Sequence, residues 1–206
     1  MGELAVYVHT PFCPSKCPYC DFNSYARPED EHELFTRACE MEIRRSEMRG
    51  TRAGTVFFGG GTPTFLAVAG LERLFSALTD TFDIATDAEI TSEANPGTVD
   101  AERFAALRAM GFNRLSIGAQ SFHDDELRAL GRVHSSAEIC RAVEAARRAG
   151  FNNLNLDLMY ALPGQTLERW RESVKAALAF EPEHLSLYCL TIERGTRYAT
   201  LDRRGL

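Results

Sequence analysis

The sequence predicts an α/β fold in which six parallel strands form an open or partial barrel with helices outside it. Short runs rich in β-branched and aromatic residues recur along the 206 residues, and such runs are typical of strands. Segments with apolar residues at helical spacing separate these runs, as in βα units. Polar residues and glycines gather just after the strand runs, where the ligands of parallel α/β folds bind.

The strand and helix candidates alternate along the chain. We expect strands at 4–9, 55–58, 89–93, 114–119, 153–159 and 185–191. We expect helices at 29–49, 68–81, 100–110, 123–130, 136–149 and 167–180. Asp100 and Thr166 stand where helix N-caps belong, because their side-chain oxygens accept hydrogen bonds from the first free N–H groups. Gly111 and Gly150 stand just after two helix candidates, where a left-handed residue ends a helix.

Length and composition predict one domain, residues 1–206, with a substantial core. Apolar residues make up 45% of the chain and charged residues 25%, which excludes disordered and fibrous proteins. The 23 Lys and Arg against 29 Asp and Glu give a net charge of −6, so we expect no nucleic-acid partner. The sequence has neither an apolar run of roughly 18 residues nor a basic n-region before an apolar h-region at its start. We therefore expect a cytoplasmic protein, associated with a membrane only through an acceptor protein.

Three cysteines form a compact motif after the first strand candidate. Cys13, Cys17 and Cys20 have the spacing C-x3-C-x2-C on a loop that contains three prolines. Iron–sulfur clusters are ordinarily held by four cysteines, so a loop with three leaves one iron with an open coordination position. The alternative is structural zinc, which takes four ligands, with His9, Cys39 or another residue as the fourth. Common zinc motifs pair two C-x2-C knuckles, and the sequence has no second one.

The remaining cysteines do not extend this motif. Cys39, Cys140 and Cys189 stand alone in helix or strand patterns. Isolated cysteines of this kind are mostly small buried apolar residues. We expect no disulfide framework, since the six cysteines form one tight cluster and three scattered residues, and we expect the cluster to be a reduced, metal-binding site.

Two further strand ends carry residues suited to a ligand. Gly60 and Gly61 belong to a run of three glycines before Thr62, and glycine lets the backbone approach a ligand and point its amide groups at it. Glu93 ends the third strand candidate. Taken alone, a triple glycine is a weak signal, and a glutamate at such a position is most often a solvated loop residue.

Polar residues also share one face of the fourth and fifth strand candidates. Side chains alternate along a strand, so every second residue points to the same side. Polar side chains inside a barrel are costly unless they meet a ligand or one another. They can therefore belong to a binding site or to a hydrogen-bonded polar layer of the core. These residues are Arg114, Ser116, Gly118 and Gln120 in the fourth strand and Asn153, Asn155 and Asp157 in the fifth.

The cysteine motif, with Tyr19 before its last cysteine and a glycine-rich strand end after it, closely resembles the radical S-adenosylmethionine (SAM) superfamily. The resemblance implies a partial (β/α)6 barrel, from which the last helix and a C-terminal domain are absent in this chain. It also implies a [4Fe-4S] cluster whose open iron chelates the amino and carboxylate groups of SAM. The reduced cluster then breaks the sulfonium bond to give a 5′-deoxyadenosyl radical. In such proteins the cofactors carry the chemistry, and the polypeptide binds and orients them.

Over nearly all 206 residues, the order of motifs resembles the oxygen-independent coproporphyrinogen III oxidase family. The motifs are Y-x5-C-x3-C-x2-C, GGGTPT, E-x-N-P, R-x-S-x-G-x-Q-S-F, L-G-R-x-H, N-x-D-L-M and L-P-G-Q-T. Without this resemblance, Arg132 and His134 would indicate an exposed polar turn. The resemblance implies that Cys13, Cys17 and Cys20 hold the cluster, and it assigns no catalytic side chain. It implies SAM contacts at Tyr7, Tyr19, Gly60, Gly61, Thr62, Glu93, Gln120, Arg132 and Asp157, and a loosely matched one at Thr191.

Two departures from the oxidases favour the haem chaperone (HemW-type) branch of that family. The oxidases have a further cysteine two residues after the third cluster cysteine, where this chain has Phe22, and they have an N-terminal extension that we expect to be absent here. The branch implies haem or porphyrin as cargo, a haem-accepting protein and a low-potential electron donor. Oxidative decarboxylation of coproporphyrinogen III is the alternative, and a radical enzyme with an unrelated substrate is a third, because fold and cofactor do not fix the substrate.

Overall fold

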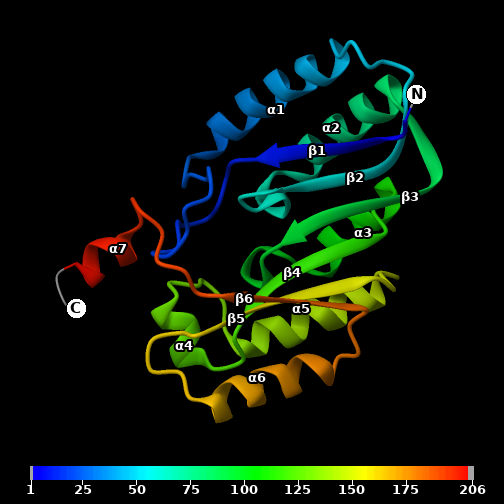
Figure 1. The fold of residues 1–206 in the computed structure, drawn as a ribbon. Coiled ribbons are helices and arrows are strands. Elements are labelled where there is room, and N and C mark those ends of the chain that lie inside the picture. Colours follow the sequence, from blue (N-terminus) through cyan, green and yellow to red (C-terminus); the bar gives the residue numbers. More distant parts are fainter. Residues whose placement is uncertain (1, 204–206) are drawn as a thin grey trace.

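The computed structural model describes residues 2–203. Six parallel strands form one sheet in chain order, with no pairing between the first strand and the last. The sheet therefore curves without closing, which confirms the predicted α/β partial barrel (Figure 1). Its strands are β1 (Leu4–Thr10), β2 (Arg52–Gly60), β3 (Asp83–Ala94), β4 (Arg114–Gln120), β5 (Leu154–Tyr160) and β6 (His184–Cys189).

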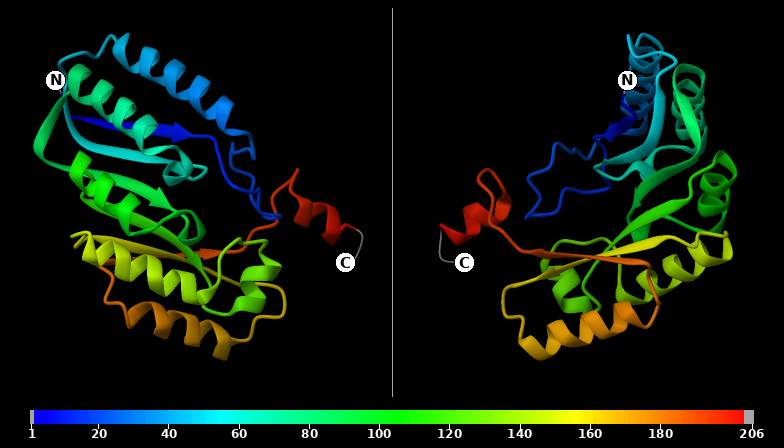
Figure 2. Two further views of the ribbon diagram at one scale, coloured as in Figure 1. Left: turned by 180° about the vertical axis from the view of Figure 1, so that it is seen from behind. Right: turned by 45° about the vertical axis from the view of Figure 1, so that its right-hand side comes forward.

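Helices follow the strands and cover one side of the sheet. Figure 2 shows the larger helices on the outer face, while the loop after β1 and the last helix lie on the other side. The α-helices are α1 (Glu29–Arg44), α2 (Val68–Thr81), α3 (Ala101–Met110), α4 (Asp124–Ala129), α5 (Ser136–Arg148), α6 (Leu167–Leu178) and α7 (Arg197–Asp202). Short 3-10 turns η1 (Pro63–Phe65) and η2 (Pro96–Thr98) follow β2 and β3.

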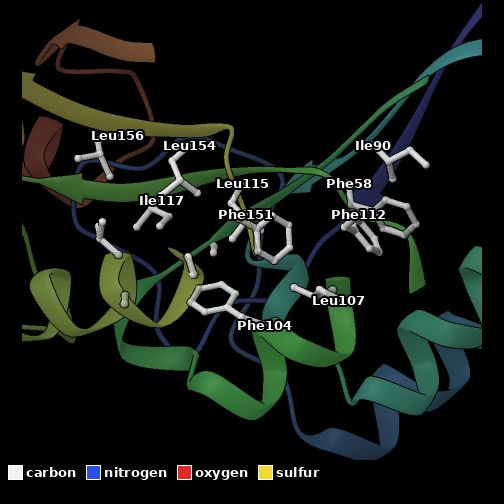
Figure 3. Packing of buried hydrophobic residues seen from close by; sticks show 14 of the residues in the cluster. Phe58, Ile90, Phe104, Leu107, Phe112, Leu115, Ile117, Phe151, Leu154 and Leu156 are labelled. Carbon is white, nitrogen blue, oxygen red and sulfur yellow. The ribbon is translucent and has the colours of Figure 1, made fainter. Parts of the chain in front are cut away.

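The hydrophobic core lies between the outer face of the sheet and these helices (Figure 3). Phe58 of β2 packs edge-on against Phe112, with ring centroids 5.1 Å apart. The ring centroid of Phe104 in α3 lies 6.2 Å from that of Phe151, which precedes β5. Each side chain of this kind stabilises the fold by roughly 1.5–3 kcal/mol when fully buried. Because this core uses the outward side chains of the strands, the inward side chains remain available for a site.

The predicted helix ends are confirmed at four positions. The side chain of Asp100 accepts a hydrogen bond from the N–H of Arg103, and Thr166 accepts one from Arg169. Gly111 has φ of +113° and Gly150 has φ of +91°, a left-handed conformation that glycine adopts without steric cost. These caps set where each helix ends and therefore where the next strand enters the sheet.

Two helix predictions differ from the structure. The helix expected at 29–49 ends at Arg44, with Arg45 as its C-cap. The chain then turns, and Gly50, with φ of +75°, donates its N–H to the carbonyl of Thr81. The segment after β6 was expected to contain no helix, but it forms α7, with Thr196 as its N-cap. Residues 204–206 of that segment lie outside the described residues. The helix α7 lies beside the loop after β1, where the N–H of Tyr198 donates to the carbonyl of Pro18 (Figure 1), so among residues 2–203 no helix after β6 covers the outer face of the sheet.

No helix among residues 2–203 has the length and apolar character required to cross a membrane.

Candidate cofactor site

The carboxyl ends of the strands surround a cavity of about 470 Å³. All three cluster cysteines line this cavity, and so do nine of the ten SAM contacts that the resemblance implies. Residues from every strand end therefore meet at one place, as expected for a parallel sheet. The implied contacts that line the cavity are Tyr19, Gly60, Gly61, Thr62, Glu93, Gln120, Arg132, Asp157 and Thr191.

Tyr7 is the implied contact that the structure places elsewhere. Its side chain is 57% exposed and does not line the cavity. The hydroxyl lies 3.2 Å from Nδ1 of His9, and the ring stacks near Phe57 with centroids 6.0 Å apart. Tyr7 lies near the middle of β1, so it is further from the strand end than the other implied contacts.

Backbone hydrogen bonds tie the cysteine loop to the glycine strand end. The N–H of Gly61 donates to the carbonyl of Thr10, and the N–H of Thr62 donates to the carbonyl of Phe12, both at 2.7 Å. The returning end of the loop is held as well, because the N–H of Cys13 donates to the carbonyl of Tyr25. The two segments that the sequence motifs single out are thus joined directly by backbone hydrogen bonds.

Lys16 is a residue of this loop that sequence reasoning missed. Its ammonium group donates to the carbonyl oxygens of Phe22 at 2.8 Å and of Ser24 at 3.1 Å. The side chain closes the loop from within and brings a positive charge to the lining of the cavity. Its position between two cysteines of the motif was the only available signal, and that signal does not indicate which way a lysine points.

Each of the three thiols has a polar neighbour. Thr62 donates its hydroxyl to Sγ of Cys13 at 3.5 Å, and Arg132 donates Nη1–H to Sγ of Cys17 at 3.8 Å. The sulfur of Cys20 lies 3.9 Å from the hydroxyl of Ser24. Hydrogen-bond donors around ligand sulfurs help to set the reduction potential of an iron–sulfur cluster, and they favour the thiolate form of the ligands. The donor set therefore fits the cluster that the motif predicts.

Within residues 2–203, no three His, Cys, Asp or Glu side chains converge as ligands of a single metal ion would.

Cys189 was expected to be a buried apolar residue, but it is exposed and lines the cavity. Cys39 and Cys140 are partly buried and lie outside the cavity.

Gly61 is packed so closely that a side chain would not fit. A Cβ atom there would lie 2.6 Å from the carbonyl oxygen of Phe12 and 2.8 Å from that of Thr10. Both neighbours are backbone atoms and cannot rotate away. We expect Gly61→Ala to lower the free energy of unfolding by about 1–3 kcal/mol, the typical cost of overpacking. Chemical denaturation measures this change. Gly54→Ala is the control for replacing a glycine, because Gly54 of β2 has no positive φ and the atoms nearest to a Cβ atom there are the carboxylate end of the flexible Glu3 side chain, which can move. Unchanged stability of Gly61→Ala would contradict the geometry.

Glu93 closes the glycine side of the cavity. Its carboxylate accepts a hydrogen bond from the N–H of Gly60 at 3.0 Å. Burial, together with the nearby carboxylate of Asp157, raises the pKa of Glu93 to about 7, although the Gly60 N–H opposes this shift. A glutamate that was ambiguous in the sequence is thus a partly buried acid that lines the cavity, where its carboxylate suits a cationic group of a ligand.

Asp157 lies across the cavity on β5 and is held by two neighbours. Ser116 donates its hydroxyl to Oδ2 at 3.0 Å, and Asn155 donates its amide N–H to Oδ1 at 2.7 Å. Burial raises the pKa of Asp157, and these hydrogen bonds act against the rise. The inward polar residues of β4 and β5 therefore form both a satisfied polar layer and part of the cavity wall.

Arg132 joins the cysteine loop to the end of β4. Its Nη2–H donates to the carbonyl of Gly118 at 3.0 Å, and its Nη1–H contacts Cys17. Among the described residues, its buried Nε–H has no hydrogen-bond partner. A buried donor without a partner costs roughly 1–3 kcal/mol, so this N–H is available for an acceptor of a bound ligand. With the close Gly61 backbone and two carboxylates, the cavity fits a zwitterionic, sulfonium-containing ligand such as SAM.

The turn that contains Arg132 is only partly exposed, because Arg132 is partly buried and His134 is buried, whereas Val133 is exposed. His134 is 5% exposed, and its ring nitrogens lie 2.9 Å from Oδ1 of Asn95 and 3.3 Å from the carbonyl of Ala119. Gln120, at the end of β4, has φ of +66°. The strand ends after β3 and β4 are thereby fastened to this turn, which local sequence pattern alone did not indicate.

Comparison with known proteins agrees with this geometry. The family model of the radical SAM superfamily matches residues 7–177. The haem chaperone HemW of Haemophilus influenzae is 41% identical over 97% of this chain and 54% of its own length. HemW of Escherichia coli is 42% identical, again over 97% of this chain and 54% of its own length. The chain thus spans about half the length of these curated relatives.

A solved structure is similar throughout the fold. The coproporphyrinogen III oxidase HemN of Escherichia coli, described as a radical SAM enzyme, superposes with a TM-score of 0.86 at 35% sequence identity. The match covers 92% of this chain and 44% of that one. With the parallel partial barrel, the three-cysteine loop and the family match over most of its length, the chain belongs to the radical SAM superfamily.

Proposed function

We propose that this chain is the radical SAM core domain of a haem chaperone, which holds a [4Fe-4S] cluster, binds SAM and delivers haem to an acceptor protein. Its likeness to HemW relatives, 38–42% identical over 97–98% of the chain, carries the proposal most directly. Phe22, which lines the cavity, supports it, because the resembling oxidases have cysteine at this position. A low-potential electron donor and a haem-accepting protein are the partners that this function requires.

In this proposal, the residues of the chain divide the work of binding. Cys13, Cys17 and Cys20 hold the cluster, which supplies an iron with an open coordination position for the amino-acid end of SAM. The carboxylates of Glu93 and Asp157 receive the cationic and hydroxyl groups of SAM. The implied contacts at the glycine strand end and at the cavity wall complete the site: Tyr19, Gly60, Gly61, Thr62, Gln120, Arg132 and Thr191. Tyr7 stays a proposed contact outside the cavity lining.

The six free cysteines fit a reducing compartment. We therefore place the protein in the cytoplasm as part of this proposal. Haem, as cargo, has no assigned ligand among the described residues.

The experiment that tests this function is a haem titration of the reconstituted protein under anaerobic conditions, followed by absorbance. We expect stoichiometric haem binding and no conversion of coproporphyrinogen III to protoporphyrinogen IX when SAM and reductant are supplied. Turnover would contradict the chaperone and favour the oxidase, which the likeness to HemN makes the second candidate. Absence of haem binding would also contradict the proposal.

Phe22→Cys separates the two functions further. If the cavity has diverged from that of an oxidase, the new thiol creates no coproporphyrinogen oxidation. We therefore expect turnover of this variant to stay at the background of the parent protein, as measured by fluorescence of the oxidised product. A gain of turnover would show that the chain retains the substrate pocket of an oxidase.

The affinity for SAM is expected to depend on pH through Glu93. With a pKa of about 7, this acid is mostly protonated at pH 6 and mostly ionised at pH 8. Only the carboxylate attracts a cationic group, so the affinity should rise about tenfold over this interval and level off above it. Calorimetric titration of SAM into the anaerobic holoprotein measures the change. Glu93→Gln should flatten the profile, and a profile that keeps its slope in this variant would exclude Glu93 as its origin.

A further inference from the structure

A chain of hydrogen bonds crosses the inner face of the last three strands and ends at Asp157. The amide nitrogen of Asn155 donates both to Oδ1 of Asp157 and to the hydroxyl of Ser116, each at 2.7 Å. The hydroxyl of Ser116 then donates to Oδ2 of Asp157 at 3.0 Å. Both carboxylate oxygens are therefore fixed by neighbours that also hold each other.

The orientation of the Asn155 amide is set from the other side. Its oxygen lies 2.6 Å from Nδ1 of His184 and accepts from the hydroxyl of Ser186 at 3.0 Å. Both partners belong to β6, the edge strand of the sheet. With an acceptor role for the oxygen and two acceptors facing the nitrogen, the amide has one orientation that satisfies all its partners.

This arrangement opposes the forces that would turn the Asp157 carboxylate. Glu93 faces the same cavity, and two carboxylates in one site repel each other. Asn155 is 2% exposed. Its hydrogen bond to Ser116 is buried and its other hydrogen bonds are partly buried, and an unmade bond at such a buried amide is costly. A carboxylate held by two buried donors keeps its remaining lone pairs directed at the cavity.

We infer that Asn155 and Ser116 are positioning residues that fix the Asp157 carboxylate for its ligand, an inference that rests on the proposed SAM site. They act through Asp157. Binding sites with first contacts locked by such a supporting layer lose about ten- to a hundredfold in affinity when that layer is removed.

The test is a set of SAM affinities measured by calorimetry on reconstituted, anaerobic holoprotein. The variants are Asn155→Ala, Ser116→Ala, Asp157→Ala and the two double variants that include Asp157→Ala. We expect each positioning variant to bind SAM at least tenfold more weakly, with unchanged iron content. The loss of buried hydrogen bonds is expected to lower the melting temperature, but each variant should still melt cooperatively and above the temperature of the titration. Ser116→Thr keeps the hydroxyl and is expected to restore the affinity. Asn153→Ala is the matched control, because this asparagine precedes β5 and does not line the cavity.

The double variants separate positioning from a general structural role. If Asn155 and Ser116 act through Asp157, each double variant binds SAM no more weakly than Asp157→Ala alone. Losses that add, or affinities of Asn155→Ala and Ser116→Ala equal to that of the parent, would overturn the inference. If Asp157→Ala itself leaves the affinity unchanged, the proposed SAM site fails and the inference with it. If Asn155→Ala folds poorly, the comparison of Ser116→Ala, Asp157→Ala and their double variant decides alone.

Discussion

Replacing Cys13, Cys17 or Cys20 by Ala is expected to abolish assembly of the [4Fe-4S] cluster. The three sulfurs belong to one loop, and each has its own polar neighbour. In the proposed site each sulfur holds a different iron. Loss of one thiolate leaves two protein ligands, which are too few to retain a cluster that already has an open iron. Iron and sulfide analysis after anaerobic reconstitution, with the absorbance of the cluster, measures the outcome.

The control for this experiment is Cys140→Ala. This cysteine is free and partly buried on α5, and it does not line the cavity. Its removal should leave the iron content unchanged. A full iron complement in any of the three loop variants would refute the ligand assignment. Zinc in place of iron in the parent protein would favour the structural-zinc alternative.

Glu93→Ala is expected to weaken SAM binding by about ten- to a hundredfold while leaving the cluster intact. A hydrogen bond to a charged group contributes roughly 1.5–3 kcal/mol, and each 1.4 kcal/mol corresponds to a factor of ten in affinity. Glu93 accepts a hydrogen bond from Gly60, and the polar neighbours of the three sulfurs are other residues. Iron content should therefore be that of the parent protein.

Asp87→Ala is the matched control for this variant. Asp87 lies on the same strand and does not line the cavity, and its carboxylate is 3.7 Å from the guanidinium of Arg52. Both side chains of this pair are exposed, and such a pair contributes little, so SAM affinity should not change. Equal affinities for the Glu93 variant, the Asp87 variant and the parent would remove Glu93 from the site.

The fold could be predicted from the sequence because its signals are local. Strand runs, helical spacing, the caps at Asp100 and Thr166 and the glycines after two helices each act within a few residues. The mistakes arose where tertiary contacts decide. The helix α7 has only six residues, and it is positioned by Tyr198, whose N–H donates to Pro18 and whose hydroxyl donates to Ala129.

The site was predictable in part for a related reason. Strand ends of a parallel sheet converge whatever their loops contain, so Gly61 and Glu93 could be expected to lie near the cysteines. Long-range contacts could not be foreseen: neither the contact of Arg132 with Cys17 nor the burial of His134 has a local signal. The resemblance supplied Arg132, and it also supplied Tyr7, which the structure places outside the cavity lining.

The most direct test of the proposed cofactor site is electron paramagnetic resonance of the reconstituted, dithionite-reduced protein with and without SAM. The cavity, with three cysteines at one end and Glu93, Arg132 and Asp157 around it, predicts a four-iron signal that shifts when SAM is added. Absence of a cluster signal, or a signal that SAM leaves unchanged, would contradict a SAM-binding cluster at these cysteines.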